Sequence, residues 1–311
     1  MAFQVSPGIS ISEKDLTTVV PNTATAIGAY CGGFQWGPVH ERTTITTENE
    51  LVDVFGKPDD LTERHFWSCA NYLAYANNLL VVRVCESGAL NATIGDNAPA
   101  AAGATVYNAT HYDSVTPAND VLFIAKYPGG LGNSLKVQVI DSNGWADSTI
   151  NATFLAHFDG APATSADVST HGGSQDEMHV IVIDEDGLWT GVPGEVLEKF
   201  AFVSKASDAK RHDGSSNYIK DVLRNESKYV WLGDVTQLTT LSVAAGTNAG
   251  QPKASATFKT FDSATAAEGV LGGSMGWGAD GVAVTVASRT AANEAKSCLP
   301  AFTSVGNSTS K

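Results

Sequence analysis

The 311-residue sequence has few basic residues. Lysine and arginine together number 19 against 33 aspartates and glutamates, so the formal net charge is −14. Affinity for nucleic acid depends on clustered lysine and arginine, and the densest cluster, from Lys205 to Arg211, is interrupted by Asp208. This composition argues against a nucleic-acid-binding protein, and we expect no nucleic-acid partner.

Long apolar runs and paired cysteines are also missing. No segment approaches the roughly 20 apolar residues of a membrane-spanning helix, and the amino terminus lacks the basic-then-apolar order of a signal peptide. We therefore expect no membrane partner and synthesis in a cytoplasm, where thiols stay reduced. The cysteines show no Cys-x-x-Cys spacing, and we expect small buried residues with reduced thiols at Cys31, Cys69, Cys85 and Cys298.

No complete catalytic or metal-binding motif is present. Gly272-Gly-Ser-Met-Gly276 matches Gly-x-Ser-x-Gly, but that motif needs a helix after its serine, and the glycine-rich segment that follows would not start one. No histidine lies beyond His212 to complete a triad, so we favour a glycine-rich turn over a serine hydrolase acting through Ser274. Asp184-Glu-Asp-Gly187 lacks the further ligands of a calcium loop and indicates a hairpin turn. We expect no enzymatic activity and no cofactor.

What the sequence does contain is typical of a globular protein. Hydrophobic residues make up 43% and charged residues 17%, and a chain of this length exceeds what one hydrophobic core usually organises. We expect an α+β fold: a small α/β unit with an extended amino-terminal arm, followed by a mainly antiparallel β domain with a few short helices. The expected boundaries are 1–15 for the arm, 16–85 for the α/β unit, 86–118 for a linker or small insertion, 119–290 for the β-rich domain and 291–311 for a polar tail.

The α/β unit has the pattern of a β-α-β crossover. Thr47 and Glu50 fit a capping box, and apolar residues at helical spacing predict a second, amphipathic helix. Strands on both sides of these helices favour helices packed on a sheet. The expected elements are a strand over 24–31, a helix over 47–55, a helix over 62–77 and a strand over 79–84. The expected core includes Ile27, Phe66, Leu73, Leu80 and Val82.

From residue 119 onward, short apolar or alternating runs are separated by turn signals such as Asn143-Gly144. This spacing favours an antiparallel sheet or sandwich. The expected strands are Val121–Lys126, Leu135–Asp141, Ala152–Phe158, Met178–Asp184, Tyr229–Leu232 and Val282–Ala287, with one helix inside 213–224.

The amino terminus is an extended arm. Residues 9–12 alternate with period two, as in a half-buried strand, and Pro7 suits the edge or start of a strand. About ten extended residues reach roughly 33 Å, so the strand can pair with its own domain or, by strand addition, with a neighbour. The residues to which we assign the arm's contacts are Phe3, Val5, Pro7, Gly8, Ile9 and Ile11.

Residues 3–85 contain four short motifs in a fixed order: Ser6-Pro-Gly-Ile9, Phe34-Gln-Trp-Gly-Pro38, Phe55-Gly-Lys-Pro58 and Leu79-Leu-Val-Val-Arg-Val84. A further motif, Tyr127-Pro-Gly-Gly-Leu-Gly-Asn133, lies beyond this range. The series resembles the amino-terminal region of contractile tail sheath proteins, especially those of phages related to T4. Nothing here resembles the large carboxy-terminal portion of that family, so we expect the chain to correspond to its amino-terminal portion.

The resemblance implies a structural subunit that polymerises around a tail tube and contracts to drive the tube through the host envelope. The implied partners are other sheath subunits in a helical tube, the tail tube protein, and the baseplate and tail terminator proteins. The implied location is the virion, after synthesis in the host cytoplasm. Exchanged arms are a feature of this family, which favours donation of residues 3–13 to an adjacent subunit. A bacteriocin or injection-system sheath is a close variant, and a β-rich phage adhesion or receptor-binding module is the alternative.

Overall fold

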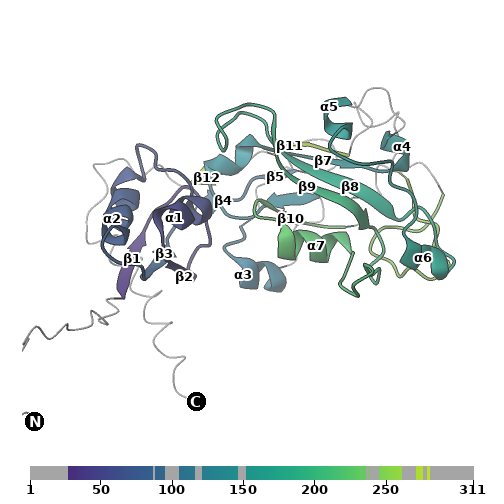
Figure 1. Cartoon of the computed structure of the whole chain (residues 1–311), viewed down its shortest axis with the longest axis horizontal. Helices are drawn as coiled ribbons and strands as arrows, with labels where there is room; N and C mark the ends of the chain where they lie inside the picture. The colour runs from purple at the N-terminus through teal and green to yellow at the C-terminus, as the bar shows by residue number, and fades with distance from the viewer. Residues whose placement is uncertain are drawn as a thin grey trace, which may run out of the picture.

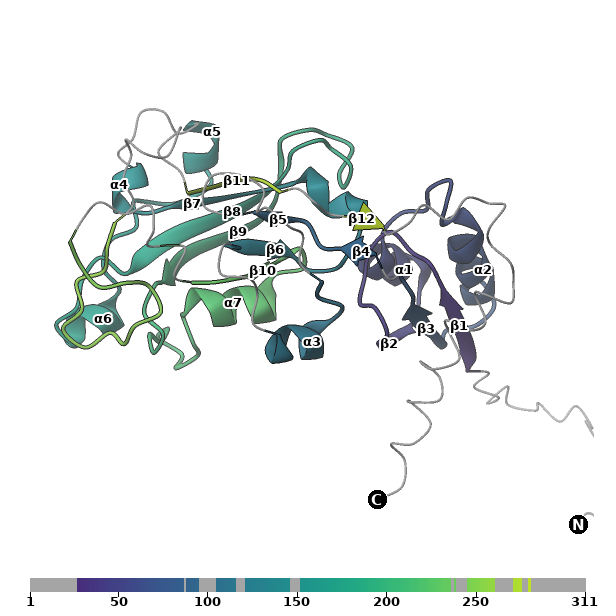
Figure 2. The ribbon, with the colours of Figure 1, turned by 180° about the vertical axis from the view of Figure 1, so that it is seen from behind.

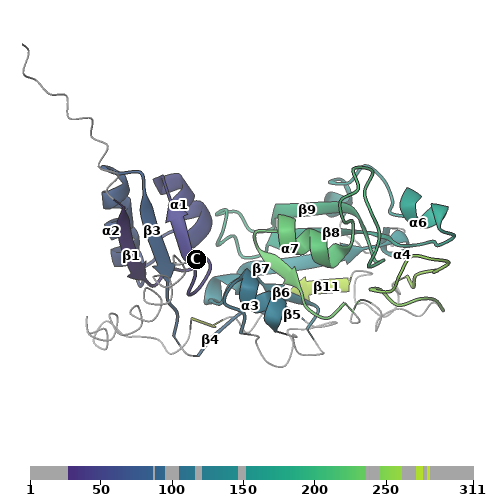
Figure 3. The same cartoon turned by 90° about the horizontal axis from the view of Figure 1, so that it is seen from below.

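The computed structural model describes residues 27–86, 88–94, 105–115, 121–145, 152–235, 238, 245–260, 271–275 and 279–280. Figure 1 shows two parts side by side, a small unit built from residues 28–83 and a larger β-rich unit. In Figure 3 the same two parts are seen from below, with strand β4 (Ala89–Leu90) between them. Mixed helices and largely antiparallel sheets give the expected α+β fold. None of the described helices is long and apolar enough to cross a membrane.

The small unit is a three-stranded sheet with two helices. Its strands are β1 (Gly28–Gly32), β2 (Arg42–Ile45) and β3 (Leu79–Arg83), in the order β1-β3-β2, and its helices are α1 (Glu48–Phe55) and α2 (Glu63–Leu73). Strands β1 and β3 pair in parallel, which is the predicted crossover. Strand β2, antiparallel to β3, was not expected.

The start of α1 follows directly from its sequence. The hydroxyl of Thr47 accepts a hydrogen bond from the Glu50 N–H at 3.2 Å, as the capping box predicts. The Glu50 carboxylate reaches back to the N–H and the hydroxyl of Thr46, both at 2.8 Å, one residue earlier than in the usual box. The helix ends at Gly56, whose φ of 81° favours glycine.

The core of the small unit lies between the two helices and one face of the sheet. Three expected core residues do not belong to it: Ile27 precedes the first paired residue of β1 and is 60% exposed, Leu80 is half-buried, and Val82 is buried outside this cluster. Leu80 and Val82 lie on the opposite face from Leu79 and Val81 because successive strand residues alternate. The other expected residues are placed as predicted: Phe66 belongs to the core and Leu73 packs against it. The core comprises Phe34, Ile45, Leu51, Phe55, Phe66, Cys69, Ala70, Leu79 and Val81.

The cysteines only partly follow the expectation. Cys69 and Cys85 are free, and burial raises the pKa of the Cys69 thiol to about 12, which keeps it protonated and inert. Cys31 is disulfide-bonded, which corrects the expectation of reduced thiols throughout. Cys298 lies outside the described residues.

The β-rich unit is built on a four-stranded sheet, β11-β7-β8-β9, and a three-stranded sheet, β10-β6-β5, both antiparallel. In Figure 2, α4, α5 and α6 gather at the end away from the small unit, while α3 and α7 lie along one side. The strands are β5 (Thr93–Ile94), β6 (Phe123–Ala125), β7 (Leu135–Ile140), β8 (Glu177–Asp184), β9 (Glu195–Ser204), β10 (Val230–Leu232), β11 (Leu271–Ser274) and β12 (Ala279–Asp280), the last paired with β4. The helices are α3 (Ala109–Ser114), α4 (Ser142–Trp145), α5 (Ala152–Leu155), α6 (Ala166–Thr170), α7 (Ile219–Glu226) and the 3₁₀ helix η1 (Gly130–Ser134).

Several sequence expectations for this unit are corrected. The segment expected as a strand over 152–158 begins as helix α5, and Asn143-Gly144 lies inside helix α4 instead of a turn. The glycine-rich segment at Ser274 is strand β11, in which Ser274 pairs with Lys136 of β7. Strand β9 was missed because its outward residues are charged and two register shifts break its alternation. The expected strand at 282–287 lies outside the described residues.

Candidate functional site

The arm residues that the sequence singles out cannot be placed. Phe3, Val5, Pro7, Gly8, Ile9 and Ile11 lie outside the described residues, so their role stays a prediction. The other motifs do meet, at the contact between the two units. We call this contact the junction and define it by residues 34–37, 53–57 and 83 of the small unit and residues 127–131, 184–190 and 228–229 of the β-rich unit.

Trp36 is the side chain through which the small unit enters the β-rich unit. It is 3% exposed and belongs to the main core cluster of the β-rich unit. Its backbone N–H donates to the Phe55 carbonyl at 3.2 Å, so the two sequence turns fix each other. Gly37 has φ of 102°, and a Cβ there would lie 2.6 Å from the Phe55 ring. Glycine is therefore required beside this tryptophan.

Arg83, at the end of β3, ties the two units together. It is 2% exposed, and its guanidinium donates to backbone carbonyls on both sides of the junction. A planar fork of five donors suits such a set of acceptors, which a lysine could not satisfy equally. The acceptors are Phe34 at 2.8 Å, Gly37 at 2.9 Å and Gln35 at 3.1 Å in the small unit, and Pro128 at 2.7 Å in the β-rich unit.

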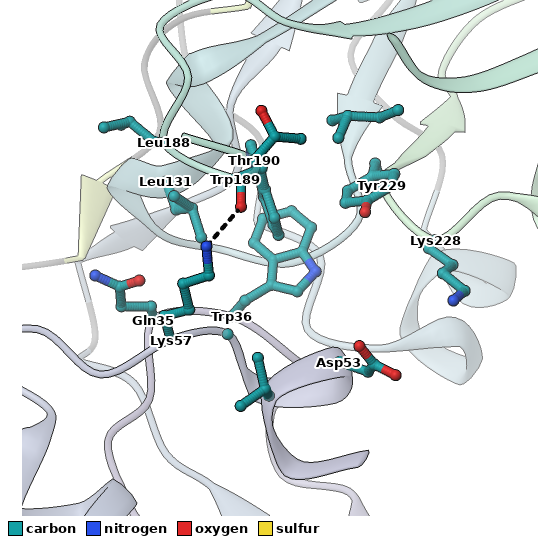
Figure 4. A pocket seen from close by; sticks show the side chains of 13 residues that line it. Gln35, Trp36, Asp53, Lys57, Leu131, Leu188, Trp189, Thr190, Lys228 and Tyr229 are labelled. Carbon is teal, nitrogen blue, oxygen red and sulfur yellow. Dashed lines mark hydrogen bonds between the residues drawn. The ribbon is translucent and has the colours of Figure 1, made fainter. Parts of the chain in front are cut away.

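Aromatic rings complete the contact, as Figure 4 shows. The Trp36 ring meets the Trp189 ring edge-on at 4.9 Å between centroids, and Tyr127 at 5.4 Å. Trp189 in turn packs edge-on against Tyr229 at 4.9 Å, and its carbonyl accepts from Lys57 Nζ at 3.1 Å. Edge-to-face pairs of this kind contribute roughly 0.5–1.5 kcal/mol each beyond area burial.

Asp184 holds the turn that presents Trp189. Its buried carboxylate accepts hydrogen bonds from the Ser134 hydroxyl at 2.7 Å, the Trp189 N–H at 3.0 Å, and the Thr190 N–H and hydroxyl at 2.8 and 3.0 Å. Burial alone would raise the pKa of Asp184, but these hydrogen bonds hold the pKa below its ordinary value. The carboxylate is thus engaged in organising a hairpin turn, the interpretation that the sequence favoured over a calcium loop.

The chemistry that the junction offers is limited. A cleft of about 220 Å³ opens between the units, with Asp53, Lys57 and Lys228 on its walls, and Figure 4 shows their side chains around it. Within the described part of the chain, no group of histidine, cysteine, aspartate and glutamate residues is arranged to hold a metal ion. Packed aromatics and a buried guanidinium make this a joint between two bodies.

The sequence analysis did not assign Trp189 or Asp184 to this site. Trp189 lies 153 positions after Trp36, and only the fold brings the two together. An aromatic residue inside a polar turn is the one local signal that could have pointed to it.

Comparisons with known proteins bear on the small unit most directly. Residues 25–84 match the family described as tail sheath protein Gp18, domain III, N-terminal region. The tail sheath protein of Salmonella phage ViI is 31% identical over 63% of this chain, and that of Vibrio phage KVP40 is 33% identical over 44%. The tail sheath protein of Enterobacteria phage T4 is 40% identical over 26% of this chain. These matches confirm the resemblance to phage tail sheath proteins.

The matches cover small parts of those relatives. The chain spans 28%, 20% and 12% of the lengths of the ViI, KVP40 and T4 proteins, respectively. Two solved sheath tail proteins, from Listeria innocua and Desulfitobacterium hafniense, are 16% and 13% identical, with TM-scores of 0.31 and 0.38 over 75% and 95% of this chain and 33% and 43% of theirs. These structural similarities are too weak to support a function. The resemblance to tail sheath proteins therefore depends on the family match and the sequence relatives.

Proposed function

We propose that this chain is a structural subunit of a contractile phage tail sheath, which polymerises around the tail tube and contracts to drive it through the host envelope. The observation that carries the proposal is the match of residues 25–84 to the tail sheath family, together with relatives that are tail sheath proteins. The proposed partners are other sheath subunits, the tail tube protein, and the baseplate and tail terminator proteins. The proposed location is the virion, and the proposed role needs no catalysis and no cofactor.

The small unit carries apolar side chains suited to subunit contacts. Trp67 on α2 is 51% exposed, Tyr75 just beyond α2 is 95% exposed, and Ile27 lies open at the start of β1. Large exposed aromatics are enriched where proteins associate. In a helical tube, such residues would be covered by the neighbouring subunits.

Residues 3–13 supply the second proposed contact, as a strand donated to an adjacent subunit. Strand addition offers backbone hydrogen bonds to a sheet edge, while alternate side chains fill the neighbour's pockets. Val5, Ile9 and Ile11 are the side chains we assign to those pockets. The observation behind this proposal is the alternation of apolar residues at 9–12, next to Pro7.

The sheath assignment is tested on virions of the phage that encodes the chain. Antibodies raised against the β-rich unit should label tails along their whole length, before and after contraction, and quantitative mass spectrometry should find the chain in copy numbers matching the tail tube protein. Labelling confined to the tail tip would support the adhesion module instead. Absence of the chain from virions would overturn the proposal.

The arm is tested by deletion in the same phage. Removing residues 1–13 should abolish ordered sheaths in electron micrographs while leaving the thermal unfolding of the purified chain almost unchanged. Ile9→Pro should act similarly, because it removes a ladder donor together with an anchor, whereas Ser10→Ala keeps both and should assemble normally. Unfolding of the domain on deletion would show that the strand pairs within its own subunit.

A further inference from the structure

The end of the large sheet that lies away from the junction brings together two side chains of opposite charge. Strands β7 and β9 both pair antiparallel to β8, so they run in the same direction and finish at the same end of the sheet. Asp141 directly follows β7, and Lys205 directly follows β9. Figure 1 shows this end of the sheet beside α4 and α6, opposite the small unit.

The pair is removed from solvent. Asp141 is 0% and Lys205 1% exposed, and Lys205 Nζ lies 3.1 Å from Asp141 Oδ2 and donates to the Lys259 carbonyl at 2.8 Å. Lys205 is the first residue of the basic cluster that ends at Arg211, and the fold buries it. Burial lowers the pKa of Lys205 against the opposing effects of Asp141 and Asp176, so burial favours the neutral amine, which is the nucleophilic form.

The second oxygen of the same carboxyl group has its own partners. Asp141 Oδ1 accepts from the backbone N–H of Asn143 at 3.0 Å and from that of Gly144 at 3.1 Å, at the start of α4. Two fixed N–H donors on one oxygen form the arrangement that stabilises the oxyanion of a tetrahedral acyl intermediate. The carboxyl group thus presents one oxygen to donors and the other to an amine.

We propose that Lys205 and Asp141 join in an intramolecular amide bond. One ammonium proton passes from Nζ to Oδ2, which leaves a neutral amine beside a neutral carboxylic acid. Nζ then attacks Cγ, and Oδ1 takes the developing negative charge under the Asn143 and Gly144 N–H groups. A second proton moves from Nζ to Oδ2, the Cγ–Oδ2 bond breaks and one water molecule leaves. The reaction needs no oxidant, reductant or further reactant.

Asp176 contacts the backbone that carries Lys205. Its carbonyl accepts from the Lys205 N–H at 2.8 Å, and its carboxylate accepts from the hydroxyls of Ser204 and Ser165. These bonds fix the backbone from which the Lys205 side chain extends. The resulting bond would connect the ends of β7 and β9 across β8, a covalent clamp on the main sheet that is independent of the proposed sheath function.

The test is the intact mass of the purified, reduced full-length chain. The main species should be lighter than the sequence mass by one water molecule, and Lys205→Met and Asp141→Ala should each restore the full mass calculated for the variant. Lys136→Met, at a partly exposed lysine of the same sheet paired with Glu185, is the matched control and should keep the loss. A wild-type chain at its full sequence mass would overturn the proposal and leave a buried ion pair only.

Peptide mapping separates this bond from cyclisation at an aspartyl-glycine step, which also releases water. Proteolysis should yield one branched peptide that contains both Asp141 and Lys205. The chain has aspartyl-glycine steps at Asp159-Gly160, Asp186-Gly187, Asp213-Gly214 and Asp280-Gly281. A water loss located at any of them, with Asp141 and Lys205 in separate unmodified peptides, would equally overturn the proposal. Because the readout is covalent mass, neither outcome depends on assembly into a sheath.

Discussion

The two ends of strand β8 each hold a buried aspartate, and the two ends are built differently. At the junction end, Asp184 is surrounded by hydroxyl and backbone N–H donors from η1 and from its own turn. At the far end, Asp176 accepts from serine hydroxyls, and the neighbouring Asp141 faces a lysine amine. Neutral donors can only fix a carboxylate in place, whereas an amine in contact with a carboxyl group can also react with it.

The difference separates two ways of making a rigid body. The junction end depends on many non-covalent interactions. They hold the turn after Asp184, the Trp189 ring and the Arg83 guanidinium in place between the two units. The far end concentrates its constraint in one pair of side chains. Two units can move relative to each other only if non-covalent contacts alone connect them. A sheet within one unit does not need to move, so a covalent bond can constrain it.

The largest effect at the junction should come from Arg83→Met. The change leaves the carbonyls of the Phe34–Gly37 turn and of Pro128 without their charged donor, and hydrogen bonds to charged groups contribute roughly 1.5–3 kcal/mol each. We expect a loss of about 3–5 kcal/mol in the free energy of unfolding, measured by urea denaturation. Arg42→Met, at an exposed arginine of the same sheet, should change it by less than about 0.5 kcal/mol.

Arg83→Met also tests whether the two ends of β8 are independent of each other. If the far end is independent of the junction, the variant should keep the same loss of one water molecule in its intact mass. A variant that regains full mass would show that the junction positions the Asp141–Lys205 pair, and the two ends would then form a single cooperative unit.

A smaller effect is expected from Trp189→Ala. Trp189 is only half-buried, so its removal should cost about 2 kcal/mol, below the 3–5 kcal/mol of a fully buried tryptophan. The neighbouring Leu188→Ala, at an exposed side chain, is the matched control. Limited proteolysis of the chain between β3 and β5, which connects the two units, should become faster in the tryptophan variant alone. Equal rates in both variants would mean that the Trp36–Trp189 contact does not hold the junction.

The small unit was largely predictable because its signals are local. The capping box of Thr47 and Glu50 fixes the start of α1, and the apolar run at 79–83 gives β3. The partner of β3 was also correct, since a parallel crossover needs a strand on each side of the helices. Ile27 was misplaced because an apolar residue just outside a strand has no neighbour to cover it within the described residues.

The β-rich unit and the junction were predictable only in part because their determinants are distant in sequence. Strand β9 alternates imperfectly, since two register shifts turn its side chains out of phase. Lys205 is separated from Asp141 by 64 positions, and no pattern around either residue distinguishes a buried lysine from a solvated one. The arm at residues 3–13 remains a prediction from the sequence alone.

The smallest expected effect concerns the pH dependence at Asp184. Hydrogen bonds hold its folded-state pKa below the unfolded value of about 4, so the unfolded chain binds the proton more readily. The stability that the carboxylate contributes is therefore fully present above pH ~4 and is lost as the pH falls through the folded-state pKa. Urea unfolding at a series of pH values should show Asp184→Asn less stable than the parent chain above pH ~4, and this difference in the free energy of unfolding should shrink in acid.

The control is Asp186→Asn, at an exposed carboxylate of the same turn, which should have the free energy of unfolding of the parent chain at every pH. A gap that stayed constant into acid would mean that the turn depends on the shape of the side chain and not on its charge, and the two ends of β8 would then be more alike than their donors indicate.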